Sequence, residues 1–211
     1  MGGVPGRCTR GVAMSDLSIS RPKLTLPPDE AAAVTQAYQQ ARVILEYGSG
    51  GSTVLAAELP GKVVFSVESS ADWLAVMQTY FAANPPLARL HLHHGDIGPT
   101  RGWGYAKDET GFRKWPGYSL SVWGLPQFLH PDLVFIDGRF RAACFLTCLF
   151  KSTAPLTVLW DDYIDRTFYH RVEELVKPVG MIGRMARFEI SPMPLPVDRL
   201  AWIFETYLRQ N

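Results

Sequence analysis

Acidic residues directly follow two short apolar segments of the chain. Asp137 follows 133–136, and Asp161 and Asp162 follow 156–160. If these segments are neighbouring parallel strands, about 4.8 Å apart, their terminal carboxylates converge on one point. Converging carboxylates repel one another unless a cation lies between them, and Mg²⁺ is a hard ion that takes oxygen ligands and exchanges its waters for substrate hydroxyls. The three aspartates therefore predict a Mg²⁺ site that orients a hydroxylated substrate, with helix capping as the alternative role for Asp162.

A glycine-rich turn closes another apolar segment, in the order Glu46-Tyr47-Gly48-Ser49-Gly50-Gly51-Ser52-Thr53. The glycines allow the backbone to approach a ligand, and a helix that begins at Ser52 offers free N–H groups. Glu46 suits a cationic amino-acid group better than a pyrophosphate. Thr53 stands where a dinucleotide site prefers a third glycine, which disfavours NAD. The turn predicts a nucleotide-like cofactor bound at Gly48, Ser49, Gly50, Ser52 and Thr53.

Two more acids follow the next two apolar segments in register. Glu68, beside Ser69, lies about 20 residues beyond the glycines, where a carboxylate can accept hydrogen bonds from both ribose hydroxyls. Asp96, beside Ile97, can accept a hydrogen bond from an adenine amino group. Each acid alone fits a loop carboxylate or a helix cap, but their order after successive strands predicts a cofactor site.

The elements that position these residues alternate between strand-like and helical patterns. Apolar strands separated by helices are typical of a parallel sheet covered on both faces, so the predicted class is α/β, doubly wound. The predicted strands are 43–47, 63–67, 90–94, 133–136 and 156–160, and the predicted helices are 28–40, 52–59, 71–83, 119–129, 141–151 and 166–176. The tail predicts a closing antiparallel hairpin of 185–190 with 201–208, because the Pro-rich turn between them is too short for a crossover helix.

One long irregular stretch, 95–118, interleaves aromatic and basic residues. We predict a lid that stacks on a substrate and attracts an anionic group; the alternative is a flap whose aromatics pack on the same domain or on a second subunit, which would make a homodimer. Arg139 and Arg141, beside Asp137, also favour an acidic substrate. The residues concerned are Trp103, Tyr105, Trp115 and Tyr118, with Arg101, Lys107, Arg113 and Lys114.

Composition narrows the class of protein further. With 21 basic and 20 acidic residues among 211, the chain has no charge excess to drive binding to nucleic acid or an anionic membrane, so neither partner is expected. Three cysteines form neither a disulfide framework nor a zinc signature, and we predict buried thiols in a cytoplasmic protein. No apolar run approaches the roughly 18 residues of a membrane span. We expect a disordered extension over 1–20 and one domain over 21–211.

The glycine turn with Glu46, Glu68 and Asp96 in order resembles the class I S-adenosylmethionine-dependent methyltransferases. The resemblance runs from about Pro28 to the C-terminus and implies a Rossmann-like, mostly parallel seven-stranded sheet. It also implies that Gly48 and Gly50 lie beside the methionine part of S-adenosylmethionine, that Glu68 holds the ribose and that Asp96 holds the adenine.

The acids Asp137, Asp161 and Asp162 resemble those of metal-dependent O-methyltransferases, including enzymes that act on macrolide sugars and catechols. The catechol enzymes place a lysine base where this chain has Phe140 and an Asn where it has Asp162. His94 is therefore our predicted base, the alternative being a hydrogen-bonded structural histidine. The resemblance implies O-methylation of a small hydroxylated substrate, such as an acidic sugar, with divalent-metal assistance; alternatives are an inactive methyltransferase-like cofactor-binding protein and an NAD-dependent oxidoreductase.

Overall fold

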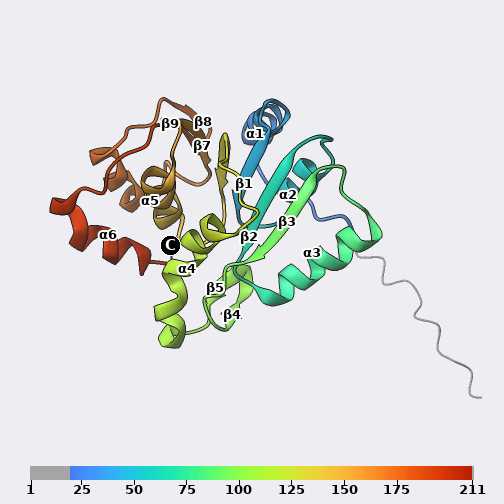
Figure 1. Cartoon of the computed structure of the whole chain (residues 1–211), viewed down its shortest axis with the longest axis horizontal. Helices are drawn as coiled ribbons and strands as arrows, with labels where there is room; N and C mark the ends of the chain where they lie inside the picture. The colour runs from blue at the N-terminus through green and yellow to red at the C-terminus, as the bar shows by residue number, and fades with distance from the viewer. Residues whose placement is uncertain (1–19, 211) are drawn as a thin grey trace, which may run out of the picture.

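The computed structural model describes residues 20–210, so the predicted disordered extension lies, except for residue 20, outside the described residues. Its centre is a seven-stranded sheet with the order β3-β2-β1-β6-β7-β9-β8 (Figure 1). The strands are β1 (Val43–Tyr47), β2 (Val63–Glu68), β3 (Arg89–His94), β6 (Leu133–Ile136), β7 (Leu156–Trp160), β8 (Gly180–Ile182) and β9 (Met185–Ile190). β1, β2, β3, β6 and β7 pair in parallel, and β9 is antiparallel to both β7 and β8. The predicted Rossmann-like α/β class is confirmed.

Helices cover both faces of this sheet (Figure 1). One face packs against α1, α2 and α3, and the other against α4, α5 and α6. The α-helices are α1 (Pro28–Gln40), α2 (Gly51–Ala57), α3 (Ala71–Ala83), α4 (Trp115–Leu120), α5 (Arg141–Lys151) and α6 (Leu200–Tyr207). Within the described residues, no helix has the length and apolar character needed to cross a membrane.

The alternation of side chains along β1 explains the two-layered core. Leu45 and Tyr47 are fully buried among residues of α4 and α5, whereas Ile44 packs beneath α1. Successive strand residues point to opposite faces, so a strand covered on both sides is apolar along its whole length. Glu46 is the exception, and it lies on the α1 face, where the hydroxyl of Tyr38 reaches it.

The predicted hairpin is present with a different partner, so the strand prediction for 201–208 was wrong. β9 pairs with β8 through a tight turn at Gly183 and Arg184, and Gly183 has a φ of +52°, a left-handed conformation that suits glycine. The segment 200–207 is α6, which buries Trp202, Ile203 and Thr206. That spacing belongs to one face of a helix, and the apolar composition alone concealed it.

The stretch 95–118 is more ordered than predicted. It contains a two-stranded ribbon of β4 (Thr100–Arg101) and β5 (Tyr105–Ala106), antiparallel to each other. Short 3₁₀ helices occur at Gly102–Gly104, Glu109–Lys114, Ser121–Gly124, Thr167–Glu174 and Val197–Arg199. The predicted helix 119–129 is thus α4 followed by a 3₁₀ turn, starting earlier at Trp115-Pro116, and the predicted helix 166–176 is a 3₁₀ helix.

The chain leaves β1 for β2 and β3 on one side, and later returns to β6 and β7 on the other. The strand order therefore reverses between β1 and β6, which pair directly. In open α/β sheets, ligands bind beyond the carboxyl ends of the strands at such a reversal. The site must then be sought in the segments after Tyr47, Glu68, Ile136 and Trp160.

Candidate functional site

A pocket of about 880 Å³ lies at this end of the sheet. Its walls are the segment 22–26, the glycine turn after β1, the end of β2 with the start of α3, the β4–β5 ribbon and the loop after β6. Of the predicted site residues, the following line it: Gly48, Ser49, Gly50, Ser52, Glu68, Ser69 and Asp137. The structure thus brings together the turn, the acid after β2 and the acid after β6.

Close packing of backbone fixes the glycine turn in place. Gly48 has a φ of +104°, and a Cβ there would lie 2.7 Å from the Gly138 nitrogen. Gly51 packs against the backbone of Lys23 and Leu24, which leaves no room for a side chain. These glycines are required because the loops after β1 and β6, and the segment before α1, meet here.

Glu46 supports the turn from beneath and does not line the pocket. It is fully buried and accepts hydrogen bonds from the hydroxyls of Tyr38 (2.8 Å), Thr53 (2.5 Å) and Ser66 (2.9 Å). Burial raises the pKa of the Glu46 carboxyl, and the hydroxyl hydrogen bonds oppose the rise. Thr53 Oγ1 also accepts a hydrogen bond from the Gly50 N–H (2.9 Å). Glu46 and Thr53 thus belong to a network that holds the turn, and their contact with a cofactor stays a prediction.

Glu68 faces the pocket from the end of β2. Its carboxylate accepts hydrogen bonds from the N–H groups of Ser49 (3.2 Å) and Ser70 (2.8 Å), and burial raises its pKa. Ser69 Oγ donates to the Gly104 carbonyl (2.8 Å), which ties the β4–β5 ribbon to this wall. Trp73, for which the sequence offered no functional signal, lines the pocket and donates from Nε1 to the Ser49 carbonyl (2.8 Å).

The predicted site residues Asp96, Ile97 and His94 also lie outside the pocket lining. Asp96 is paired with Lys114 (2.8 Å) and accepts from the Gly98 N–H, and its pKa is lowered first by Lys114. Ile97 is a core residue with 1% exposure. His94 ends β3, and its Nε2 lies 3.2 Å from the Ser69 carbonyl. Since β2 and β1 separate β3 from β6, the structure does not bring His94 beside the acid after β6.

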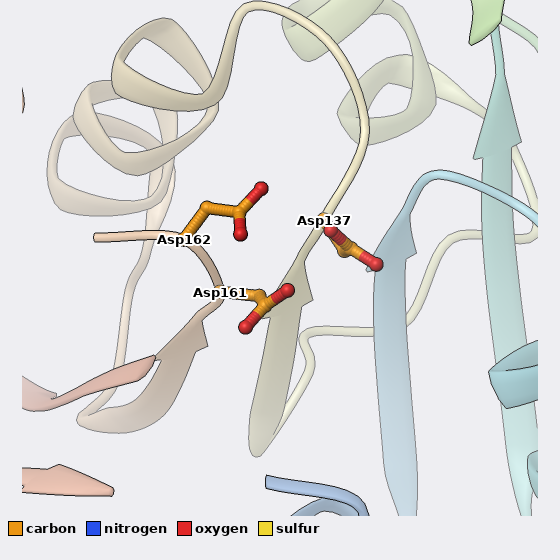
Figure 2. A group of neighbouring side chains, drawn as sticks. All are labelled: Asp137, Asp161 and Asp162. Atoms are coloured by element: carbon orange, nitrogen blue, oxygen red, sulfur yellow. The ribbon is translucent and has the colours of Figure 1, made fainter. Parts of the chain in front are cut away.

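Figure 2 shows Asp137, Asp161 and Asp162 gathered at the ends of β6 and β7, as predicted. One carboxylate oxygen from each lies within 4.8 Å of the others. Asp161 is fully buried, whereas the Asp137 side chain is 32% exposed and lines the pocket. Asp162 has a φ of +55°, a left-handed conformation that Asp and Asn adopt more readily than most residues, and it forms ion pairs in place of the alternative helix cap.

Arginine side chains already supply the positive charge for this cluster. Arg141 lies between the acids, with Nη2 3.0 Å from Asp137 Oδ1 and Nη1 3.3 Å from Asp162 Oδ2. Arg184 binds Asp161 through two nitrogens, at 3.0 and 2.7 Å. Arg166 Nη2 lies 2.7 Å from Asp162 Oδ2.

This donor set does not fit Mg²⁺. The Arg141 side chain is only 3% exposed, and it also donates to the carbonyls of Gly138 (3.0 Å) and Asp161 (2.6 Å), so it is fixed where a shared ion would lie. Three guanidinium groups balance the three carboxylates. A dication would add repulsion against arginines that have no other carboxylate partner in the described part of the chain.

Asp137 combines an altered pKa with access to the pocket. Burial raises the pKa of its carboxyl to about 6, the charge of Arg141 opposes the rise, and Asp161 and Asp162 add to it. Its Oδ1 lies 3.0 Å from Arg141 Nη2, and within residues 20–210 its Oδ2 accepts no hydrogen bond. A carboxylate with a pKa near neutrality and a free oxygen in a pocket can act as a general base.

Comparisons with known proteins agree with this architecture. A methyltransferase-like protein from Silicibacter pomeroyi is 48% identical, with a TM-score of 0.86, over 90% of this chain and 98% of that chain. The O-methyltransferase TomG from Streptomyces achromogenes, solved with S-adenosylmethionine, is 16% identical, with a TM-score of 0.55, over 81% of this chain and 82% of that one. An O-methyltransferase from Bacillus cereus, solved with S-adenosylhomocysteine, is 16% identical, with a TM-score of 0.54, over 78% and 82%. No protein-family model and no curated protein matches the chain.

Proposed function

The chain belongs to the class I S-adenosylmethionine-dependent methyltransferase superfamily, and we propose that it methylates a hydroxyl oxygen of a small molecule, with Asp137 as the proton acceptor. The observation that carries the proposal is the free Asp137 carboxylate oxygen in the same pocket as the glycine turn and Glu68. The similarity to the Silicibacter pomeroyi protein over nearly the whole of both chains supports the same class of activity.

The residues that line the pocket fit S-adenosylmethionine. Glu68 would accept hydrogen bonds from the ribose hydroxyls, since its carboxylate is held by the N–H groups of Ser49 and Ser70 and lies at the pocket wall. The turn from Gly48 to Gly50 would lie along the methionine part, where it presents backbone without side-chain bulk. When bound, this cofactor supplies an electrophilic methyl group on a sulfonium. The indole of Trp73, fixed by its hydrogen bond to Ser49, would close the pocket beside the ribose wall.

The proposed role of Asp137 is to take the proton of the acceptor hydroxyl. Bound S-adenosylmethionine would supply the methyl group to that oxygen and would leave, with its sulfur–methyl bond broken, as the neutral thioether S-adenosylhomocysteine. Arg141 holds one carboxylate oxygen and leaves the other for the acceptor. Methyl transfer needs alignment and exclusion of water as much as a base, and the β4–β5 ribbon would supply the cover. The proposed transfer proceeds without metal assistance, because Arg141 lies between the carboxylates of Asp137 and Asp162.

Binding and turnover experiments test this function. Calorimetry with S-adenosylmethionine, S-adenosylhomocysteine and NAD should show binding of the first two and none of NAD; preference for NAD would instead favour the oxidoreductase alternative. Transfer of a radiolabelled methyl group to a panel of small hydroxylated compounds, including acidic sugars, should be lost in Asp137→Asn while cofactor binding is kept. Cofactor binding without turnover on any acceptor would support the inactive cofactor-binding alternative.

A further inference from the structure

The Arg139 side chain is buried and unpaired at the pocket wall. The residue is 9% exposed and lines the pocket, yet its Nε and Nη1 have no hydrogen-bond partner within residues 20–210. The other arginines near this end of the sheet are paired: Arg141, Arg166 and Arg184 each bind a carboxylate, whereas Arg139 does not. The Arg139 guanidinium lies over the face of the Tyr105 ring, 4.1 Å from the ring centre.

A buried guanidinium without hydrogen-bond acceptors destabilises the folded protein, because it has lost its hydrating water. Contact with an aromatic face recovers only part of the lost free energy, whereas a bound anion would supply the missing acceptors. Contact with the face of Tyr105 restricts the position of the guanidinium but supplies no hydrogen-bond acceptor for its Nε and Nη1. A planar fork of donors in a fixed orientation matches the two oxygens of a carboxylate or phosphate.

The strand order places Arg139 on the acceptor side of the pocket. Glu68 and the glycine turn follow β2 and β1, which form the proposed cofactor half. Arg139 follows β6, on the other side of the reversal, and comes shortly after the proposed base Asp137. Its partner Tyr105 belongs to the ribbon that forms the cover of the pocket.

The ribbon presents a further group suited to a substrate. Trp103 lies between Gly102 and Gly104 at the bend of the ribbon, lines the pocket, and is 88% exposed. Its φ of +63° is a left-handed conformation that is strained for a bulky residue. A large aromatic side chain held in a strained conformation and exposed at a pocket rim is typical of a residue that packs on a ligand.

We propose that Arg139 binds an anionic group, a carboxylate or phosphate, of the methyl acceptor and so selects acidic hydroxylated substrates. The inference rests on the proposed function and deepens it by naming the substrate class. Arg139 then orients the acceptor so that its hydroxyl faces Asp137.

Anion binding at the pocket can be measured without knowledge of the natural acceptor. Protein saturated with S-adenosylhomocysteine is titrated with inorganic phosphate, with 4-hydroxybenzoate and with its uncharged analogue 4-hydroxybenzamide, and tryptophan fluorescence reports binding through Trp73 and Trp103. The variants are Arg139→Gln, Arg139→Lys and, as a matched control, Arg113→Gln, whose side chain is exposed outside the pocket lining.

We expect at least one anion to bind the wild type and Arg113→Gln at least about tenfold more tightly than it binds Arg139→Gln. The Kd for Arg139→Lys should lie between these values. The Kd for the uncharged 4-hydroxybenzamide should be the same for all variants. Arg139→Gln should keep the Kd for S-adenosylmethionine within about twofold and a Tm no lower than that of the wild type, since it removes an unpaired buried charge.

Other results would overturn the proposal. Equal anion affinity in wild type and Arg139→Gln means that Arg139 binds no anion. A tenfold weaker Kd for S-adenosylmethionine in Arg139→Gln assigns the guanidinium to the cofactor carboxylate. A lower Tm with unchanged anion binding assigns it a structural role. Failure of the wild type to bind S-adenosylmethionine refutes the proposed function. The phosphate titration is repeated without cofactor, so that anion binding at Arg139 is tested independently of cofactor binding.

Discussion

Replacing Glu46 by glutamine tests whether this acid holds the glycine turn or contacts a ligand. Its carboxylate is fully buried and accepts hydrogen bonds from the hydroxyls of Tyr38, Thr53 and Ser66, at 2.8, 2.5 and 2.9 Å. In the Glu46→Gln variant an N–H₂ group replaces one of these oxygens. The best arrangement turns the amide nitrogen toward Tyr38, because the other oxygen then still serves both Thr53 and Ser66.

The expected cost follows from this geometry. A hydrogen bond to a charged acceptor contributes about 1.5–3 kcal/mol, and the variant loses one and weakens two. Removal of a buried charge, whose pKa burial raises, offsets part of that loss. We expect a net decrease of about 1–2 kcal/mol in the free energy of unfolding. For a chain of this size the decrease corresponds to a Tm lower by about 2–8 °C.

Urea unfolding followed by circular dichroism measures the change, and calorimetry measures the affinity for S-adenosylmethionine. Glu58→Gln is the matched control: Glu58 is paired with Arg21 at the surface, and such pairs contribute only about 0–1 kcal/mol. The reasoning is refuted if Glu46→Gln unfolds at the wild-type urea concentration while its Kd for S-adenosylmethionine rises tenfold or more. That result would mean that Glu46 binds the cofactor, as the sequence alone predicted.

Four further outcomes are expected. Methyl transfer should fall about tenfold per pH unit below a pH of about 6, because protonation of Asp137 removes the base. Any residual activity of the Asp137→Asn variant should not show this decrease at low pH. The raised pKa of Asp137 also means that its contribution to stability is full below the pKa of an unfolded aspartate and is lost as the pH rises through about 6, so Asp137→Asn should unfold at higher urea than wild type at neutral pH. Chelation with EDTA should leave turnover unchanged, and a loss restored by Mg²⁺ would contradict the arginine-paired site. Gly138→Ala should lower stability by about 1–3 kcal/mol, since its Cβ would lie 2.8 Å from the Gly48 nitrogen, whereas Gly117→Ala, with open space around it, should not.

The parallel core of the fold could be predicted from the sequence because its signal is local. Each of the strands β1, β2, β6 and β7 is a short, mostly apolar run closed by glycine or an acid, and its burial on both faces produces that pattern. The edge strand β3 is only partly buried and carries three histidines, so its signal is weaker. The segment 200–207 lacks this clarity, since an apolar helix packed on α5 and an apolar strand have similar composition. Only the spacing of Trp202, Ile203 and Thr206 distinguishes the two.

The sequence predicts where the site lies in the fold better than it predicts what each side chain does there. An acid at a strand end can face the pocket, as Glu68 does, or lie beneath the turn, as Glu46 does. The alternation of side chains decides between them: Glu46 lies within β1 on the α1 face, where Tyr38 and Thr53 can reach it. The contribution of Trp73 was hidden because its indole nitrogen binds a backbone carbonyl, and no sequence pattern reports such a bond.

The acidic cluster shows that the arginines near a group of carboxylates must be considered together with the carboxylates themselves. Sequence reasoning required a cation among Asp137, Asp161 and Asp162 and supplied Mg²⁺, yet Arg141 and Arg166 each stand four residues after one of these acids and pair with it. The distinction has a chemical consequence. Coordination to a dication would keep Asp137 ionised well below its ordinary pKa, whereas the monovalent guanidinium of Arg141, which is shared with Asp162, leaves burial dominant and the pKa of Asp137 at about 6. Arginine in place of a metal would therefore leave Asp137 able to accept a proton near neutral pH, as its proposed role requires.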